Sequence, residues 1–457
     1  MIDFRDPKSF DGAGKKITIM GLGLLGRGLG DTLFLAKEGA DLIVTDLKTA
    51  RELKPSLDKL KKFKNIKYTL GKHKIEDFKG RDIILRGPSV PKDSKYLKVA
   101  RGEGTPVEMD DSLFAKHCPA KIIGVTGTKG KTTVATWIYD GLNQHSKKKV
   151  YLAGNVLGVA TLPLIEKVKK DDLVVLELSS WQLQGWDEAK ISPHIAVITN
   201  IYPDHMNYYK GDMGAYVNDK KAIYKHQTAR DYLIVNKKSK YFKDLKKEAK
   251  SGVYGFDLPE IKDALKFDYV GRHDLENLAA AGLVLEILKF KLKQEFVSRL
   301  KRVENRLELI LEDKKAGVHY INDTTATTPI ATQKALEALT SPQPPSNYTF
   351  ANKIILIAGG SDKGLDFKDL ALDIKKKCKS LVLLKGDATE KLKKELTKIN
   401  YEKIVGEYSN LTQAVKRAKS LAKKGDVILF SPACTSFGMF INEYDRGDKF
   451  KKIVKSL

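Results

Sequence analysis

The sequence predicts an α/β protein of three domains: a Rossmann-like N-terminal domain, a central domain of the P-loop ATPase type with a parallel sheet, and a Rossmann-like C-terminal domain. Short β-branched runs alternate with helical patterns along the chain, which is the rhythm of parallel βαβ units. A glycine follows such a run at Gly21, Gly127 and Gly359, and each predicts the crevice of a separate sheet. The length of 457 residues also exceeds what one hydrophobic core usually serves.

The predicted elements follow one another in the order of strand, turn and helix. We expect strands at residues 17–20, 41–45, 83–85, 122–126, 173–178, 195–199, 354–358, 381–384 and 427–430. Helical patterns fill the segments between them, and a Pro-rich stretch at 340–352 predicts a surface loop. The predicted domains therefore cover residues 1–110, 111–302 and 303–457.

The composition is that of a soluble globular protein, with a hydrophobic fraction of 42% and a charged fraction of 30%. No apolar run approaches the roughly 20 residues that a membrane-spanning helix needs. The first residues, 1–14, are too polar for the apolar region of a signal peptide. Cys118, Cys378 and Cys434 lie far apart, without the spacing of paired or metal-binding cysteines. We therefore expect a cytoplasmic protein with reduced thiols.

The net charge of +25 arises from 82 Lys and Arg residues against 57 Asp and Glu residues. Such a charge would suit a nucleic acid or an anionic membrane. The basic residues are spread over separate segments, however, at 59–67, 237–250, 375–379 and 391–403. This favours a lysine-rich solvated surface, with attraction of polyanionic substrates or a weak membrane-surface association as the alternatives. A nucleic-acid-binding ATPase should interleave basic residues with stacking aromatics, and no such stretch is found, so no nucleic-acid partner is expected.

The first glycine-rich motif runs from Gly21 to Gly26 and follows the first predicted strand. Asp46 lies about twenty residues further on, which completes the pattern of a dinucleotide fingerprint. Taken alone, the motif would suggest an oxidoreductase. A single glycine fingerprint is weak support for a redox cofactor, and the later motifs decide between the functions.

The second motif, residues 124–133, reads Gly-Val-Thr-Gly-Thr-Lys-Gly-Lys-Thr-Thr and lies between a predicted strand and a predicted helix. This order is typical of a phosphate-binding loop, although the glycines are one residue closer than in the general pattern. Gly127 and Gly130 let backbone N–H groups turn toward phosphate oxygens. Lys131 can neutralise the β- and γ-phosphates, and the Thr132 hydroxyl can bind Mg²⁺. An ordinary glycine turn beside a surface lysine is the weaker interpretation.

Two further polar sites follow predicted strands in the same domain. Glu177 ends an apolar run, and a carboxylate at a strand end faces the sheet crevice, so it is a candidate Mg²⁺ ligand, with a helix cap or surface charge as the alternative. His205 belongs to the polar cluster 199–206, which closes the next strand. A single histidine is usually structural, but its place beside a nucleotide loop favours a ligand or substrate contact.

Together these segments resemble the Mur ligase family, and the resemblance runs through most of the chain. The stretches 177–183 and 21–26 are most similar to members that add D-glutamate to UDP-N-acetylmuramoyl-L-alanine. Later matches are Asn277 in a Gly-x-His-Asn-x-x-Asn-like segment at 271–281, and Arg306 and Glu308 in an Arg-x-Glu pair. Asn322, Asp323 and Thr327 match an Asn-Asp-Ser-x-Ala-Thr-like motif, and two glycine- or serine-bearing loops at 359–364 and 431–446 also match.

The resemblance implies an ATP-dependent amide-bond ligase that works through an acyl phosphate. The implied catalytic residues are Lys131, Glu177, His205 and Lys220. The implied ATP-binding residues are Gly127, Thr128, Lys129, Gly130, Lys131, Thr132, Thr133, Asn277, Arg306 and Asp323. The implied contacts of the UDP-linked substrate are Gly23, Leu24, Leu25, Asp46, Asn155 and Ser179, and those of the amino acid are Thr327, Lys363 and Ser436.

The resemblance also implies two Mg²⁺ ions and a monomeric enzyme. Thr132 and Glu177 would bind one ion, and His205 would bind the second. Lys220 would become an anionic ligand by carbamylation, which requires an accessible neutral amine. Considered without the resemblance, Lys220 is one lysine among many.

Four positions depart from the family pattern. Asp274 stands where the family usually has Asn, and Thr325 stands where a Lys is common. Asn305 stands where a His often occurs, and the segment that begins with Arg86 replaces a Ser-Pro-Gly turn. These departures concern the substrates more than the ATP, so L-glutamate or another acceptor remains an alternative, as does the L-alanine-adding type of Mur ligase. The segment around Glu177 favours the D-glutamate type. An oxidoreductase would leave the phosphate loop and Glu177 without a function.

Overall fold

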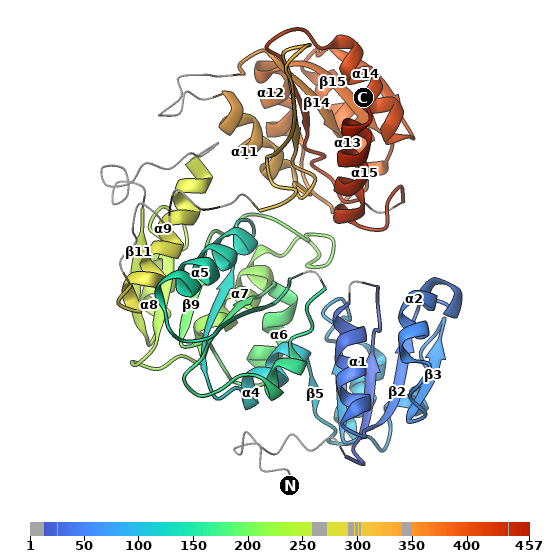
Figure 1. Ribbon diagram of the computed structural model, residues 1–457, viewed down its shortest axis with the longest axis vertical. Coiled ribbons are helices and arrows are strands. Elements are labelled where there is room, and N and C mark those ends of the chain that lie inside the picture. The colour runs from blue at the N-terminus through green and yellow to red at the C-terminus, as the bar shows by residue number, and fades with distance from the viewer. Residues whose placement is uncertain are drawn as a thin grey trace.

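The computed structural model describes residues 13–457 except for 25, 157, 258–271, 291–296, 298–299, 301–302, 341–349 and 437. The chain forms three α/β parts, each built on its own sheet, and Figure 1 shows them in chain order from blue through green to red. The predicted fold class is confirmed. The domain boundaries at 110 and 302 stay predictions. Within the described residues, no helix has both the length and the apolar character to cross a membrane.

The first part is a five-stranded parallel sheet in the order β3-β2-β1-β4-β5. Its strands are β1 (Lys16–Met20), β2 (Asp41–Asp46), β3 (Ile66–Leu70), β4 (Ile83–Arg86) and β5 (Val107–Glu108), and its helices are α1 (Arg27–Lys37), α2 (Ala50–Leu60), the 3₁₀ helix η1 (Ile75–Phe78) and α3 (Lys95–Gly102). The strand order reverses between β1 and β4, and that reversal opens a crevice at their carboxyl ends. Gly28 lets α1 pack closely against the chain that follows β1, because a Cβ atom at this position would lie 2.5 Å from Leu22 O.

The middle part is a six-stranded parallel sheet in the order β11-β10-β9-β6-β8-β7. Its strands are β6 (Lys121–Thr126), β7 (Val150–Gly154), β8 (Leu173–Glu177), β9 (Ile195–Ile198), β10 (Tyr232–Asn236) and β11 (Gly252–Phe256). The helices are α4 (Asp110–His117), α5 (Lys131–His145), η2 (Leu162–Glu166), α6 (Ser180–Glu188), α7 (Met213–Lys225), α8 (Phe242–Glu248) and α9 (Arg272–Ile287). Because β6 lies between β8 and β9, the residues that follow these three strands meet at one edge.

The C-terminal part is a six-stranded sheet in the order β12-β13-β17-β14-β15-β16. Its strands are β12 (Glu308–Asp313), β13 (Val318–Asn322), β14 (Ile354–Ala358), β15 (Cys378–Leu384), β16 (Ile404–Tyr408) and β17 (Val427–Phe430), and its helices are α11 (Pro329–Thr340), α12 (Lys368–Lys377), α13 (Asp387–Lys398), α14 (Leu411–Leu421) and α15 (Glu443–Lys455). The sheet is mixed, because β12 is an antiparallel edge strand paired with β13. The hairpin β12–β13 was not among the predicted strands, and neither were β3, β5, β7, β10, β11 and β16.

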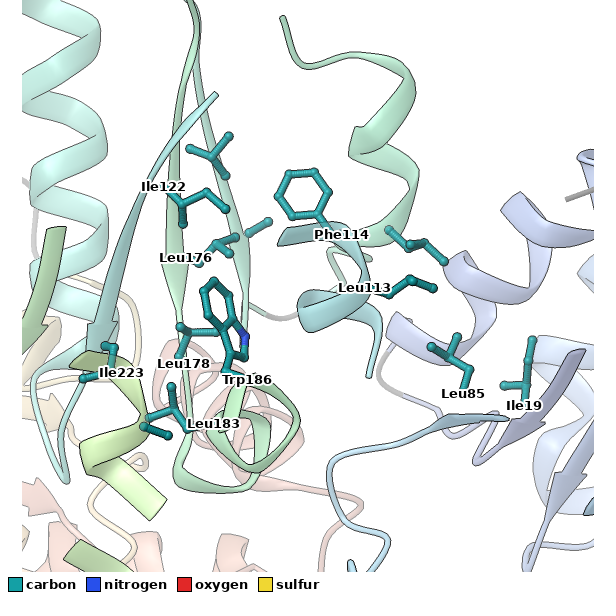
Figure 2. Close-up of a cluster of buried hydrophobic side chains, with 14 of the residues drawn as sticks. Ile19, Leu85, Leu113, Phe114, Ile122, Leu176, Leu178, Leu183, Trp186 and Ile223 are labelled. Carbon is teal, nitrogen blue, oxygen red and sulfur yellow. The ribbon is translucent and has the colours of Figure 1, made fainter. Parts of the chain in front are cut away.

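One continuous cluster of buried apolar side chains joins the first part to the middle part. Leu113 and Phe114 of α4 lie at its centre: Leu113 points toward Leu85 and Ile19 of the first sheet, and Phe114 points toward Ile122 of β6 (Figure 2). The C-terminal sheet has its own cores, one on each face. The first two parts therefore share apolar packing, whereas the C-terminal part is stabilised from within.

Candidate active site

Two glycines set the shape of the predicted phosphate-binding loop, which connects β6 to α5. The φ angles of Gly127 and Gly130 are 149° and 81°, in the region that residues with a side chain disfavour. A Cβ atom on Gly127 would lie 1.9 Å from Thr199 Oγ1, and one on Gly130 would lie 2.3 Å from Asn277 Oδ1. Only glycine fits both places, and the loop so formed leads directly into the first turn of α5. The N–H groups of a helix's first turn suit a phosphate.

Hydrogen bonds hold this loop against the segment that follows β9. Thr128 N donates to Asn200 O at 2.9 Å, and Lys129 N donates to Asn200 Oδ1 at 2.8 Å. Thr199 Oγ1 donates to Lys129 O at 2.6 Å. The side chain of Lys131 turns back to the loop, where its Nζ donates to Thr128 O at 3.1 Å. These hydrogen bonds fix the conformation of the loop.

A cavity of about 320 Å³ lies next to this loop, between the middle and C-terminal parts. It brings together predicted ATP-binding residues from both parts, namely Lys129, Gly130, Thr133, Asn277, Arg306 and Asp323. Its remaining lining includes apolar and charged side chains that no motif had indicated, among them Trp137, Phe256, Ile330, Ala331, Lys334, Ala335 and Glu337. An apolar wall beside a phosphate loop is the arrangement that a nucleotide base and its phosphates require.

Arg306 connects the C-terminal part to the phosphate loop. Its Nη2 donates to Thr132 Oγ1 at 3.0 Å, so the hydroxyl predicted to bind Mg²⁺ accepts a hydrogen bond here. Asp323 is held at the end of β13, where its Oδ2 accepts from Ser431 Oγ at 2.8 Å and its Oδ1 from Leu307 N at 3.3 Å. The predicted ATP contacts of the C-terminal part thus lie at the mouth of the loop.

Glu177 ends β8 beside the loop and is only 2% exposed. Its Oε1 accepts a hydrogen bond from Asn155 Nδ2 at 3.2 Å, while its Oε2 has no hydrogen-bond partner among the described residues. A buried carboxylate oxygen without a donor is costly unless a cation binds it. The described residues contain no cluster of three or more His, Cys, Asp and Glu with the arrangement of a metal site. Mg²⁺ fits this setting, because it takes few protein ligands and keeps water and phosphate oxygens.

Lys220 and His205 approach the loop from α7 and from the segment after β9. Lys220 is 2% exposed, and its Nζ donates to Gly127 O at 2.8 Å and lies 4.7 Å from the centre of the Tyr216 ring. Burial, together with Lys131, holds the pKa of Lys220 well below its usual range. Burial also lowers the pKa of His205 to about 3, and its ring lies 4.5 Å from that of Trp181. Both shifts favour the neutral form of the group, which carbamylation of a lysine and metal binding by an imidazole require.

The residues predicted for the amino acid lie in three loops of the C-terminal part, which follow β13, β14 and β17. Lys363 Nζ donates to Thr327 Oγ1 at 3.3 Å. Ser436 is 4% exposed and follows Thr435, whose N donates to Ser361 O at 3.1 Å. The structure brings Lys363 and Thr327 into contact and places Ser436 on the neighbouring loop.

The residues predicted for the UDP-linked substrate come from two sheets: Gly23, Leu24 and Asp46 lie at the carboxyl edge of the first sheet, whereas Asn155 and Ser179 follow β7 and β8 of the middle sheet. Gly23 N donates to Asp46 Oδ2 at 2.9 Å, and Asp46 Oδ1 accepts from Lys48 N at 2.8 Å. Leu24 is 39% exposed, and Leu25 lies outside the described residues. The carboxylate of Asp46 therefore shapes the glycine loop itself, in addition to the predicted uridine contact.

Ser179 has a structural function that the motif analysis did not foresee. It is the N-cap of α6, where its Oγ accepts from Gln182 N at 3.3 Å and donates to Gln182 Oε1 at 2.8 Å. The Ser-x-x-Gln spacing is the sequence signal of a capping box. A substrate contact of Ser179 stays a prediction, and its hydroxyl would have to share that contact with the cap.

Comparison with known proteins identifies the family. The family model of the Mur ligase middle domain matches residues 125–267, and that of the glutamate ligase domain of Mur ligases matches residues 305–434. The UDP-N-acetylmuramoylalanine–D-glutamate ligase of Roseiflexus sp. (strain RS-1) is 37% identical over 97% of this chain and 99% of its own length. The chain belongs to the Mur ligase family.

Further comparisons agree with this assignment. The enzyme of the same name from Borreliella afzelii is 36% identical to this Mur ligase over 96% of the chain and 97% of its own length. The UDP-N-acetylmuramate-alanine ligase of Thermotoga maritima superposes with a TM-score of 0.62 over 97% of this chain and 99% of its own, at 18% identity. The MurF ligase of the same organism, solved with ADP, superposes with a TM-score of 0.60, covering 99% of this chain and 97% of its own at 16% identity. At that identity the structures support the fold alone.

Sequence reasoning missed one charged residue of this Mur ligase, Asp204. Its Oδ1 accepts from Lys363 Nζ at 3.0 Å, and its Oδ2 lies 3.8 Å from Lys129 Nζ. The only signal in the sequence was its position directly before His205, in the polar cluster 199–206. A carboxylate between two lysines from different parts of the chain is visible only in the fold.

Two departures from the family pattern contact each other in this Mur ligase. Thr325 stands in place of the common lysine, and its Oγ1 donates to Asn305 O at 2.9 Å. Asn305 stands in place of the usual histidine, with a φ angle of 65°, and its Oδ1 accepts from Asn322 Nδ2 at 2.8 Å. Because Thr325 also lines the cavity, the two replacements change the wall of the nucleotide site together.

Proposed function

We propose that this Mur ligase uses ATP to join D-glutamate to UDP-N-acetylmuramoyl-L-alanine, with release of ADP and phosphate, in peptidoglycan precursor synthesis. The relatives that carry the name of this activity are 33% to 37% identical over nearly the whole chain. The observation that carries the proposal is the site between the middle and C-terminal parts. A phosphate loop, a cavity with an apolar wall and the unpaired oxygen of Glu177 meet there.

In the proposed reaction, the γ-phosphoryl group of ATP passes to the substrate carboxylate and gives an acyl phosphate. Lys131 and the loop N–H groups would neutralise and orient the phosphates, and Arg306 would approach them from the C-terminal part. The acyl phosphate makes the carbonyl carbon open to attack by the amine of the amino acid. The resulting tetrahedral intermediate would expel phosphate and leave the amide bond.

Thr132 and Glu177 would hold one Mg²⁺, and His205 with a carbamylated Lys220 would hold a second. Bound there, the ions would supply positive charge to the phosphate and carboxylate oxygens. Burial lowers the pKa of Lys220 and so favours its neutral amine, which supports the carbamate because only a neutral amine reacts with CO₂. Release of CO₂ on acid treatment of the native enzyme, and its absence from Lys220→Met, would establish the modification.

The two carboxylates of the amino acid would meet Lys363, Thr327 and Ser436. The UDP-linked substrate would reach the same point from the other side, with Gly23, Leu24, Leu25, Asp46, Asn155 and Ser179 as its contacts. The residues of the proposed site all come from one chain, which supports a monomer. Two of its substrates, ATP and the UDP-linked carboxylate, are nucleotides, which supports an enzyme that acts in the cytoplasm.

The test is phosphate release from ATP and Mg²⁺ in the presence of UDP-N-acetylmuramoyl-L-alanine. D-glutamate, L-glutamate, L-alanine and other amino acids are compared, and Lys131→Ala is the control. Release that needs both the UDP-linked substrate and D-glutamate, and that Lys131→Ala abolishes, is the expected result. Release with another amino acid instead of D-glutamate would support a ligase that has a different amino-acid specificity. No release with any acceptor would refute the proposal.

A further inference from the structure

Asp204 is a buried carboxylate that touches the phosphate loop and the amino-acid loop at once. It is 5% exposed, and it lies in the polar segment 199–206 that follows β9, the strand that borders the loop strand β6. Its Oδ1 accepts from Lys363 Nζ at 3.0 Å and from His205 N at 2.9 Å. Its Oδ2 lies 3.8 Å from Lys129 Nζ. Both oxygens therefore face donors of the protein, in contrast to the free Oε2 of Glu177.

The backbone around this ion pair is also in contact across the two parts. Asn207 N donates to Lys363 O at 3.2 Å. A Cβ atom on Gly364, whose φ angle is 71°, would lie 3.3 Å from Asn207 N. The segment that begins with Asp204 and the loop that carries Lys363 thus pack backbone against backbone. The position of Lys363 is set by this contact as well as by its own side chain.

The charges of the site explain why a carboxylate stands at this point. The like charges of Lys131, Arg306 and Lys363 act on Lys129, and those of Arg306 and Lys363 act on Lys131. The carboxylate of Asp204 lies between Lys129 and Lys363, 3.8 Å from the first ammonium group and 3.0 Å from the second, and offsets the repulsion between these two lysines.

We infer that Asp204 is a positioning residue of the ligase: its carboxylate fixes the ammonium group of Lys363 beside the phosphate loop, and so aligns the amino acid with the acyl phosphate. The inference rests on the proposed function, in which Lys363 meets a carboxylate of the amino acid. Asp204 touches neither substrate. It acts through Lys363, and through Lys129 on the side of the nucleotide.

Asp204→Asn tests the inference, because it removes the charge and keeps the shape. We expect the KM for the amino acid to rise about tenfold or more, with the KM for the UDP-linked substrate unchanged. Asp426→Asn is the matched control. Asp426 is also 5% exposed and pairs with a lysine, Lys379, within the C-terminal part and away from the site. This control should leave the KM for the amino acid as in the wild type.

A double-mutant cycle separates positioning from other roles. Lys363→Met should raise the same KM, and adding Asp204→Asn to it should cause little further rise, because the two residues act as one unit. Additive effects would overturn the inference, and so would a change confined to the Mg²⁺ concentration that activity needs. If Asp204→Asn does not fold, Asp204→Glu, which moves the charge by one methylene, replaces it in the cycle.

Failure of the inference can be told apart from failure of the proposed function. The wild-type enzyme is measured first for phosphate release with the UDP-linked substrate and each amino acid. If no acceptor supports release, the proposed function fails before any variant is compared. If release is normal and the cycle is additive, the function stands and the positioning role of Asp204 does not.

Discussion

The contact between the first and middle parts should lose stability as the pH rises from 6 to 8, and Asp111 should be the reason. Asp111 lies in α4 and is fully buried; Gln182 and Trp186 donate hydrogen bonds to its two oxygens. Arg27 of α1 lies 3.8 Å from the same carboxylate and 3.4 Å from that of Asp110. Burial and the neighbouring Asp110 raise the pKa of Asp111 to about 7, against the opposing effect of Arg27.

The size of the effect follows from linkage between folding and proton binding. In the unfolded chain the carboxyl is ionised above about pH 5, whereas in the folded protein it keeps its proton until about pH 7. Ionising it inside the fold is therefore a cost that begins above the unfolded pKa and is complete above the folded one. Between pH 6 and pH 8 this cost amounts to about 1 kcal/mol, and over the whole range to about 4 kcal/mol.

Thermal unfolding of the wild type and of Asp111→Asn measures this effect. Asn is never charged, so the difference in midpoint between the two proteins should change with pH by roughly 2 °C from pH 6 to pH 8. The absolute midpoint of the variant will be lower at acid pH, because its amide can accept only one of the two hydrogen bonds. Asp31 is buried in the same cluster, and Asp111 adds to the effects of burial and Asp110 that raise its pKa, so the measured difference includes the influence of Asp111 on Asp31. Parallel pH curves for the two proteins would refute the reasoning.

Three other substitutions test the geometry of the site. Gly127→Ala should lower ATP-dependent phosphate release at least about 100-fold, because the added carbon would lie 1.9 Å from Thr199 Oγ1. Gly102→Ala is the control, since a Cβ atom at Gly102 would meet open space. Equal rates for the two variants would contradict the loop geometry. Ser179→Ala should lower the free energy of unfolding, measured in urea, by about 1 kcal/mol, because the N-cap of α6 is lost. Ser179→Thr keeps the capping hydroxyl and is the control. An unchanged free energy of unfolding in Ser179→Ala would argue against the capping role. Arg446→Lys should lower the free energy of unfolding of the C-terminal part, measured in urea, by about 3 kcal/mol, because the buried guanidinium makes three hydrogen bonds. An unchanged free energy of unfolding would contradict this role of Arg446.

The fold class and the phosphate loop could be predicted because their signals are local. A β-branched run, a glycine turn and a helix pattern occupy adjacent positions, and the loop needs Gly127 and Gly130 for backbone reasons that hold in any protein. The strand ends at Glu177 and His205 could be found in the same way, since parallel strands direct their carboxyl ends to one edge. The edge strand β12 was missed because its residues alternate between half-buried and exposed, without the apolar run that marked the inner strands.

What could not be predicted depends on residues far apart in the sequence. The cavity wall joins Phe256 of β11 to Ile330 of α11, and no motif relates the two. Asp204 could be recognised only from its contact with Lys363, which is distant in the sequence and adjacent in space. Ser179 is a different case: the Ser-x-x-Gln signal of its cap was present in the sequence, and the functional interpretation had concealed it.

The place of β17 in the C-terminal sheet bears on how this chain is made. This strand is the last to leave the ribosome, yet it lies between β13 and β14, with parallel partners on both sides. Until Val427–Phe430 has been synthesised, the earlier strands of that sheet form two separate halves with unpaired inner edges. A premature stop before Val427 would therefore remove the centre of the sheet, and with it the link between Asp323 and Ser431 at the nucleotide site.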